Sequence, residues 1–429
     1  MEMLSGFYTV CILLVALTLA MVHAQDDQSD FISIDCGIPE GSKYTDKKTG
    51  ITYVSDAGFI EGGVSGEILP EYNYGSLDLA LTTLRSFPQN IRNCYTLRPK
   101  QGKDLWSTIS FEDASSGYYD EIIHLASSDY IHICLVNTGQ GNPVISSIEL
   151  RPWDLSMEEP PSTSLDQYYR YSFGSNERVR YRDDKYDRIW LPWTLPGTRV
   201  VQTSNTVTPG PLAVPSRVMS TAITPSISTD NISMVFNTSI RYMYIFYAHF
   251  AEVEILQSNQ TREFIIYLNG ERWYRPYSPS TNTFTLKSIS YHTGSSTYKF
   301  EINKTLTSTL PPLINAIEIY RVRQFQLQQT EDQDAAAIWS IKSTYGLTRN
   351  WQGDPCITRA YLWNGLGCNY SDPQAAKIIS LNLSSSGLSG EIATALANLT
   401  MLESLDLSYN NLTGDVPEFL ARQDHLRIL

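Results

Sequence analysis

The chain has 429 residues, which is too long for one ordinary hydrophobic core and predicts two to four structural units. Its hydrophobic content of 42% is normal for a globular protein and argues against disorder. The net charge of −13 disfavours nucleic acid as a partner, because such a surface cannot neutralise phosphate groups.

Residues 1–24 are typical of a secretory signal peptide. An apolar run extends from Phe7 to Val22, and Ala24 ends a candidate cleavage site before Gln25. The run is shorter than the roughly 20 residues that a membrane span usually needs. We therefore expect a cleaved signal and the secretory pathway, with a retained membrane anchor as the alternative.

Export predicts disulfides and N-glycans. Five cysteines follow the signal, so one is left over if the others pair within the chain: Cys36, Cys94, Cys134, Cys356 and Cys368. Eight N-x-S/T sequons lie in the second half of the chain: Asn231, Asn237, Asn259, Asn303, Asn369, Asn382, Asn398 and Asn411. The pairing among the first three cysteines stays open.

Two strand-rich segments predict two tandem β domains. Residues 31–153 and 168–325 contain short β-branched and aromatic runs, separated at residues 154–167 by a polar, proline-bearing linker. The run 31–37 resembles 169–174, and 147–150 resembles 316–319, as expected of two copies of one β-sandwich. The first copy is 32 residues shorter between these matched runs, which would open sheet edges.

A helix and a cap are expected at residues 330–370. Thr330–Gln333 fits a capping box, Gly346 supplies a stop, and Ala335, Ile338 and Trp339 form an apolar stripe. A Cys356–Cys368 bridge beside Trp351 and Trp363 would cover the first turn of a solenoid. Zinc binding by the two cysteines is the less favoured alternative.

Residues 377–429 predict about two leucine-rich repeats. Six positions recur at a step of 24, from Leu381 to Leu405 and onward, and such a step is the leucine-rich-repeat signature. The inward leucines build the solenoid core. Asn410 takes the place where a buried amide satisfies the backbone of the bend, and Ser386 holds that place one repeat earlier.

The sequence favours binding over catalysis. It contains no glycine-rich phosphate loop, H-R-D, D-F-G, G-x-S-x-G or H-E-x-x-H motif, and we expect no cofactor and no resident metal. His124 and His132 are interpreted as satisfied histidines of strands. Asp183, Asp184 and Asp187 could hold a cation, but a solvated turn with an Asp187–Arg188 pair is favoured.

Aromatic residues are abundant and could stack on sugar rings. The candidate platforms are Tyr72 with Tyr74, Tyr118 with Tyr119, Trp190 with Trp193, and Trp273 with Tyr274 and Tyr277. Ordinary packing within a sandwich is the favoured interpretation of each group.

Several motifs together resemble one family. They are Ile34–Gly37 (I-D-C-G), Arg92–Pro99, Ile131–Gly139, Tyr181–Trp190, and Trp351–Cys356 (W-x-G-D-P-C) ahead of the repeats. From Phe31 onward the chain resembles the ectodomain of a plant malectin-like, leucine-rich-repeat receptor-like kinase. The resemblance implies a mainly β fold, with two malectin-like sandwiches, a cap and a short solenoid.

The resemblance also implies a function. Family members bind extracellular carbohydrate or secreted peptides, often beside a co-receptor, and continue into a membrane helix and a cytoplasmic Ser/Thr kinase. We expect this chain to be the non-enzymatic recognition region at the plasma membrane, held there by a missing C-terminal helix or an uncleaved signal. A secreted decoy or scaffold, or the regulatory exterior of a kinase, are the alternatives.

The sequence departs from the family pattern at two places. Lys103 runs directly into Asp104, where relatives carry some thirty more residues, as a skipped exon or a faulty gene model would produce. The chain also ends at Leu429 inside a repeat, so we expect a fragment, a truncated product or a decoy.

Overall fold

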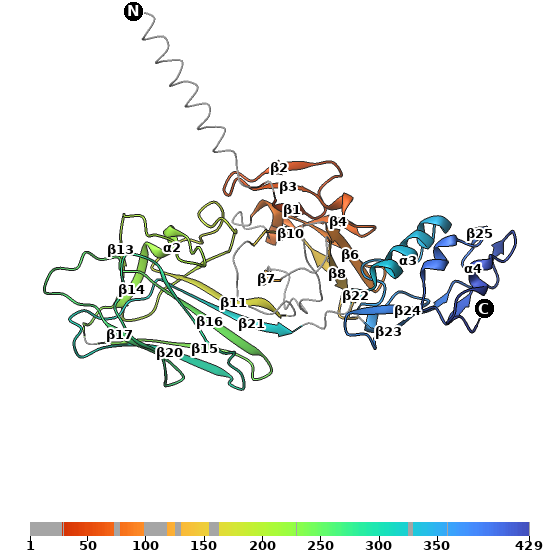
Figure 1. The fold of residues 1–429 in the computed structure, drawn as a ribbon. Helices are drawn as coiled ribbons and strands as arrows, with labels where there is room; N and C mark the ends of the chain where they lie inside the picture. Colours follow the sequence, from red (N-terminus) through yellow and green to blue (C-terminus); the bar gives the residue numbers. More distant parts are fainter. Residues whose placement is uncertain are drawn as a thin grey trace, which may run out of the picture.

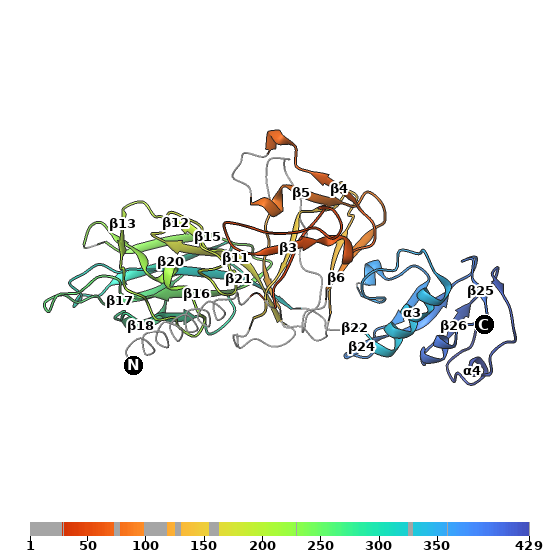
Figure 2. The same ribbon diagram turned by 90° about the horizontal axis from the view of Figure 1, so that it is seen from above.

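The computed structural model describes residues 28, 30–72, 78–97, 118–124, 130–153, 163–228, 230–324, 329–357 and 359–428. The expected signal peptide, the junction at Lys103 and the first part of the expected linker lie outside these residues. Two β domains, a cap and a solenoid follow along the chain. Figures 1 and 2 show the second domain and the solenoid on opposite sides of the first domain.

The first domain is built from small sheets with the strand orders β10-β1-β3-β2, β4-β5-β9 and β6-β8. The strands are β1 Ile32–Asp35, β2 Lys43–Thr45, β3 Thr52–Ser55, β4 Val64–Glu67, β5 Thr83–Ser86, β6 Arg92–Leu97, β8 Ile131–Val136, β9 Val144–Ile145 and β10 Ser147–Leu150. Three 3-10 turns accompany them: η1 Asp56–Gly58, η2 Pro70–Tyr72 and η3 Leu79–Leu81. Ile34, Phe87, Tyr95, Leu97 and Ile148 form the buried core.

The second domain is a sandwich of two larger sheets. One has the order β12-β11-β21-β16-β19 and the other β15-β20-β17-β18, with the ribbon β13-β14 beside them. The elements are β11 Thr163–Phe173, β12 Leu191–Trp193, β13 Thr198–Gln202, α2 Ser216–Met219, β14 Thr221–Pro225, β15 Ile232–Asn237, β16 Met243–Phe250, β17 Phe264–Leu268, β18 Glu271–Tyr277, β19 Phe284–Lys287, β20 Thr297–Lys304 and β21 Ala316–Gln324. Side chains alternate between the core and the solvent along some of these strands. In β15, Ile232, Met234 and Phe236 are buried and the residues between them are exposed.

The boundary between the domains differs from the prediction. Strand β11 begins at Thr163, so the last part of the expected linker, residues 163–167, belongs to the second domain. Strand β7, Ile122–Ile123, belongs by sequence to the first domain but pairs antiparallel with β11. The two domains therefore share a sheet.

The register of the strands confirms that the two domains are copies of one fold. Strand β1 pairs parallel with β3 and antiparallel with β10, and β11 pairs parallel with β12 and antiparallel with β21. Ile34 lies opposite Ile148, and the matching residues Tyr171 and Ile317 lie opposite each other.

A glycine at the same place in each copy supports the match. Gly37 follows β1 with φ +96° and Gly174 follows β11 with φ +84°. A Cβ on Gly37 would lie 2.2 Å from the carbonyl oxygen of Leu84, and one on Gly174 would lie 3.0 Å from that of Ala222. Only glycine permits both this conformation and this close approach.

The first copy is the smaller one in the described part of the chain. Strand β21 pairs on its far side with β16, which pairs in turn with β19. Among the residues that the structure describes, the corresponding sheet of the first domain ends at β10. This agrees with the shortfall in length between the matched runs.

The cap begins with β22, Gln329–Thr330, and the helix α3, Asp332–Tyr345, which ends at Gly346 in the left-handed conformation as predicted. The predicted capping box is wrong, because Glu331 is the N-cap residue and no side chain caps the helix. The apolar stripe is corrected in part: Ala335 and Ile338 are buried, whereas Trp339 is 37% exposed. Its aromatic edge contacts Trp363.

The solenoid confirms the leucine-rich repeats. Strand β24, Ala375–Asn382, pairs parallel with β26, Ser404–Asp406, and Leu381 lies beside Leu405, one repeat step away. The remaining elements are η4 Arg359–Tyr361, β23 Leu366–Asn369, β25 Ser389–Gly390, η5 Thr394–Asn398, β27 Asn411–Leu412 and α4 Glu418–Ala421. The leucines of both repeats share one core with α3, Trp351 and Trp363.

Asn410 performs the predicted role at the bend. Its carbonyl oxygen accepts from the backbone N–H groups of Ser386 and Leu388, and its amide donates to the carbonyls of Leu383, Leu407 and Ser408. One side chain thus satisfies five backbone groups from two repeats.

We predict that Asn410→Ala destabilises the solenoid by about 2–3 kcal/mol, because buried backbone groups lose their partners. Thermal unfolding measures the change. Tyr409→Ala is the matched control, since this neighbouring side chain is 88% exposed. Equal loss of stability in both variants would show that the amide has no special role.

Candidate functional site

The W-x-G-D-P-C segment forms a compact cap at the start of the solenoid. Cys356 and Cys368 are joined in the predicted disulfide. Trp351 and Trp363 stack with ring centroids 5.1 Å apart, and both are buried. The cap therefore covers the apolar end of the repeats.

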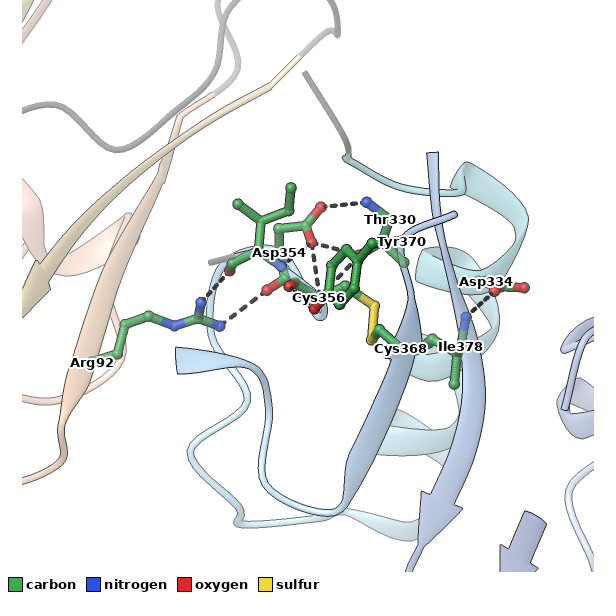
Figure 3. Close-up of a disulfide and its surroundings, with 9 residues drawn as sticks. Arg92, Thr330, Asp334, Asp354, Cys356, Cys368, Tyr370 and Ile378 are labelled. Atoms are coloured by element: carbon green, nitrogen blue, oxygen red, sulfur yellow. Dashed lines mark hydrogen bonds between the residues drawn. A yellow bond between two sulfur atoms is a disulfide. The ribbon is translucent and has the colours of Figure 1, made fainter. Parts of the chain in front are cut away.

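Asp354 organises the turn inside this cap. Its carboxylate accepts from the backbone N–H groups of Cys356 and Ile357, at 2.9 Å each, and from the hydroxyl of Thr330 at 2.5 Å (Figure 3). The backbone N–H of Thr330 also donates to Asp354 at 3.1 Å. Thr330 is thus engaged by the cap, which is why it does not cap α3.

Arg92 of β6 ties the first domain to this cap. Its guanidinium donates to the carbonyl of Ile357 at 2.5 Å and to that of Asp354 at 3.0 Å (Figure 3). It also donates to the carbonyl of Gln352 at 2.5 Å. The side chain is buried. Burial lowers the pKa of Arg92 to about 10, and the charge of Asp354 opposes this only in part. Arg92 therefore stays charged at neutral pH and satisfies three carbonyls.

Amide side chains of the cap cover the open edge of β6. The backbone N–H of Cys94 donates to the side-chain oxygen of Gln352 at 2.8 Å, and Asn350 donates to the carbonyl of Arg92 at 2.8 Å. Strand β6 pairs on its other side with β8. The two amides thus take the place of a further strand.

A second disulfide lies at the same junction. Cys94 and Cys134 face each other across β6 and β8 and are bonded. A Cβ on Gly353 would lie 2.8 Å from the sulfur of Cys94 and 3.0 Å from that of Cys134. The glycine of the W-x-G-D-P-C motif is therefore required for close packing on this disulfide. Cys36 is the left-over cysteine and is buried.

A carboxylate of the second domain joins the two β domains. Asp187 accepts hydrogen bonds from Arg180 of its own domain and from Arg151 of the first domain, both at 2.7 Å. Arg180 also donates to Glu149 of β10 at 2.8 Å. Burial alone would raise the pKa of Asp187, but the bonds and charges of the two arginines outweigh it and lower that pKa.

The acidic cluster is thereby corrected. It is neither a solvated turn nor paired as expected, because Asp184 and Asp187 are buried and the partner of Arg188 is Asp184, at 2.7 Å. Asp183 pairs with Arg217 at 2.7 Å. Across the described ranges, no group of three or more histidine, cysteine, aspartate or glutamate residues could hold a metal ion.

Other charged groups form ion pairs and hydrogen bonds inside the fold. Arg170 is buried, with Nε 2.8 Å from Glu318 and its two terminal nitrogens 2.7 and 2.6 Å from Glu121. His249 contacts Glu318 at 3.2 Å, and burial lowers the pKa of this histidine. His124, just after β7, contacts the hydroxyl of Ser164, and His132 of β8 contacts that of Thr96.

The proposed aromatic platforms have different outcomes. Trp190 is fully buried, where it donates to Asp184 at 2.8 Å, so it is not a surface platform. Trp193 is half-buried against Tyr171 and Phe236. Tyr74 lies outside the described residues, Tyr72 is half-buried, and Tyr118 and Tyr119 are exposed at 49% and 53%.

The fourth group, Trp273 with Tyr274 and Tyr277, lies at one edge of the second sandwich. Tyr277 stacks on Phe284 with centroids 4.5 Å apart, and Tyr274 lies 5.3 Å from the same ring. Trp273 packs on Phe246 and Phe300 of the core. Phe284 was missed from the sequence, although it sits in an alternating run (T-F-T-L-K) that is typical of a strand.

Six of the eight sequon asparagines are exposed, and Asn303 and Asn369 are half-buried. Glycosylation stays a prediction. In the described part of the chain, no helix is long and apolar enough to cross a membrane.

Comparisons with known proteins agree with this architecture. The Malectin-like domain family model matches residues 34–105 and 101–322, and the Leucine Rich Repeat model matches residues 401–422. The two malectin-like matches meet at residues 101–105, where the sequence predicts missing strands. The chain therefore belongs to the malectin-like domain family.

Curated relatives are similar to this chain over most of its length. It is 39% identical over 91% of its length to a putative leucine-rich repeat receptor-like protein kinase of Arabidopsis thaliana, and 41% identical over 94% to a probable LRR receptor-like serine/threonine-protein kinase of that plant. It spans 48% and 51% of these relatives. The second alignment runs over 445 positions, more than this chain contains, so that relative has residues without a counterpart here.

Solved structures show the same fold. The crystal structure of the plant receptor-like kinase FER matches with a TM-score of 0.58 and 17% identity, over 68% of this chain and 96% of that one. A structure of the plant peptide RALF23 in complex with FER and LLG2 matches with a TM-score of 0.56 and 16% identity, over 69% of this chain and 96% of that one. The chain thus combines malectin-like domains with leucine-rich repeats, and it is similar to the matching half of leucine-rich repeat receptor-like kinases.

We predict that Arg92→Met lowers the stability of the assembly by about 2–4 kcal/mol, because three carbonyls at the junction lose their donor. Thermal unfolding and amide exchange at Gln352–Ile357 measure the effect. The stability of Arg92→Lys should lie between that of the parent and that of Arg92→Met, since an ammonium cannot reproduce the forked donors of a guanidinium. Arg241→Met, at an exposed arginine, is the control. An unchanged exchange rate in Arg92→Met would contradict this role.

A second prediction concerns Asp334 in the first turn of α3. Its carboxylate accepts from the backbone N–H of Ile378 at 2.7 Å (Figure 3), and burial raises its pKa to about 6. The folded protein therefore binds this proton more tightly than the unfolded chain does, and stability falls as the pH rises from about 4 to about 6.

Asp334→Asn removes this cost and keeps an acceptor for Ile378. We expect it to stabilise the solenoid by about 1–3 kcal/mol at pH 7 and to change little at pH 4. Unfolding measured at both pH values tests this. Asp332→Asn in the same turn is the control, because Asp332 is exposed. A gain of equal size at both pH values would refute the assignment.

Proposed function

We propose that this chain recognises an extracellular ligand, either a cell-wall carbohydrate or a secreted peptide, for a plant cell-surface receptor-like kinase. The observation that carries the proposal is the malectin-like domain pair joined through the cap to leucine-rich repeats, shared with receptor-like kinases over most of the chain. The chain itself acts by binding. Signalling would come from a Ser/Thr kinase domain of a longer product, across the plasma membrane.

A carbohydrate ligand is supported by the aromatic edge of the second domain. Tyr274, Tyr277 and Phe284 form a half-buried cluster between the edge strands β18 and β19 of the two sheets. Rings held in this way present apolar faces to the flat side of a sugar, and the tyrosine hydroxyls can hydrogen-bond to it. The packing fixes the rings before a ligand arrives, which lowers the entropic cost of binding.

A peptide ligand is supported by a structural neighbour. FER is crystallised with the peptide RALF23 and with LLG2. By analogy, this chain would bind a secreted peptide and a co-receptor on the outer side of the plasma membrane. The buried junction at Arg92 would hold the solenoid in a fixed position beside the domain that binds the ligand.

We predict that the chain binds oligosaccharides of the plant cell wall and that Tyr277→Ala weakens this binding about tenfold, because one stacking face is lost. A glycan array followed by calorimetry measures the affinity. Phe284→Ala should have a similar effect, whereas Tyr409→Ala, at an exposed tyrosine of the solenoid, should have none. Thermal unfolding of each variant verifies that the sandwich is intact.

The outcomes separate the two ligand classes. Binding that is unaffected by Tyr277→Ala and Phe284→Ala would place the carbohydrate elsewhere. If no wall oligosaccharide binds but a secreted peptide does, the carbohydrate form of the proposal is wrong and the peptide form stands. Failure of both ligand classes would overturn the proposed function.

A further inference from the structure

Strand β4 of the first domain has an unpaired edge. It pairs antiparallel with β5, with Glu67 opposite Thr83 and Ser65 opposite Arg85, and the described residues provide no strand on its other side. Val64, Ser65 and Glu67 are all exposed. Figure 2 shows β4 beside β5 within the first domain.

The hydrogen-bond pattern tells which backbone groups are free for another strand. The N–H of Ile68 donates to the carbonyl of Thr82, so Gly66 and Val64, two and four residues earlier, also face β5. On the far side of β5, the N–H of Phe87 donates to Pro143, which fixes the same alternation. The N–H and C=O groups of Ser65 and Glu67 therefore point away from the sheet.

The edge has only some of the common forms of protection. Strand β4 is four residues long and carries the charged Glu67, but it contains no proline, lysine or bulge. Gly66 is not required by the fold, because a Cβ there would make an ordinary contact of 3.4 Å with Leu84. A glycine in a strand often marks a place where another backbone approaches closely.

A hollow lies beside this edge on the face of the sheet that carries Glu67. It has a volume of about 410 Å³ and is lined by Glu67, Ile68, Pro70, Thr82 and Thr83. Val64 is 56% exposed on the opposite face, because side chains alternate along a strand. A strand that continued the sheet would therefore place alternate side chains against the hollow and the others beside Val64.

The charge around the edge is negative. Glu61, Glu67 and Glu71 are exposed. Arg85 is the basic residue within residues 61–72 and 78–86, and its guanidinium is held by Asp56. Glu61 pairs with Lys342 at 3.5 Å, and the exposed carboxylates of Glu67 and Glu71 favour a positively charged partner.

We propose that β4 is a docking edge for an extended cationic peptide, which adds as a strand alongside Ser65 and Glu67 and places an aliphatic side chain against the hollow. This is recognition by strand addition, in which backbone bonds give affinity and side-chain contacts give specificity. The inference rests on the proposed function in its peptide form and assigns that ligand to the first domain.

The test uses this chain and a synthetic nine-residue peptide of alternating lysine and valine. We expect the peptide to slow amide exchange at Ser65 and Glu67. Ser65→Pro should weaken binding about tenfold, because it deletes an outward N–H without touching the bonds to β5. Ser65→Ala is the matched control, since it keeps that N–H and should bind within about twofold of the parent.

A peptide of alternating glutamate and valine should not bind, because Glu67 and Glu71 repel it. Equal binding of the lysine peptide to the parent and to Ser65→Pro, with both proteins folded, would overturn the docking edge. The same samples are tested on the wall oligosaccharides and secreted peptides of the preceding section. A ligand that binds both proteins alike would leave the proposed function intact and remove β4 from it.

Discussion

The guanidinium of Arg92 is the contact on which the arrangement of the domains depends. It reaches from an edge strand of the first β domain into the cap and satisfies three backbone carbonyls there. The cap in turn shares its hydrophobic core with the leucines of the solenoid. A buried charge is costly unless its hydrogen bonds are complete, so the domain and the cap fit together in one orientation. Arg151 and Asp187 repeat the same device between the two β domains, with the acceptor now a carboxylate.

This way of joining domains explains the residues of the family motifs. In W-x-G-D-P-C, the tryptophan fills the core of the cap and the glycine leaves room for the disulfide of the first domain. The aspartate binds the backbone of its own turn, and the cysteine fixes the turn to β23. In Arg92–Leu97, the arginine and Cys94 supply the other half of the contact. The two motifs lie some 260 positions apart in the sequence, yet they are complementary halves of one junction.

The sequence predicted correctly those parts of the fold that depend on residues close together in the chain. The repeat step located the solenoid and the role of Asn410, and the glycine at position 346 located the end of α3. The cap disulfide was also expected. The errors concern residues whose partners are distant. Thr330 fits a capping box, but it is hydrogen-bonded to Asp354 instead. Trp190 was a candidate surface aromatic, but Val214, Val218 and Ala316, far along the chain, pack around its ring. A short window of sequence cannot reveal these contacts, because the path of the chain between the contacting residues is not known from the sequence.

The shortened first domain shows how a distant segment can replace a strand. Its strands β1, β3 and β10 keep the register of β11, β12 and β21, so the duplication persists in what the structure describes. A sandwich with fewer strands has more unpaired backbone at its edges, and such edges need cover. At β6 the cover comes from two side-chain amides. Gln352 accepts from the N–H of Cys94, and Asn350 donates to the carbonyl of Arg92. The cap thus completes the first domain while that domain positions the cap. Neither half of this contact can be removed without exposing buried polar groups in the other.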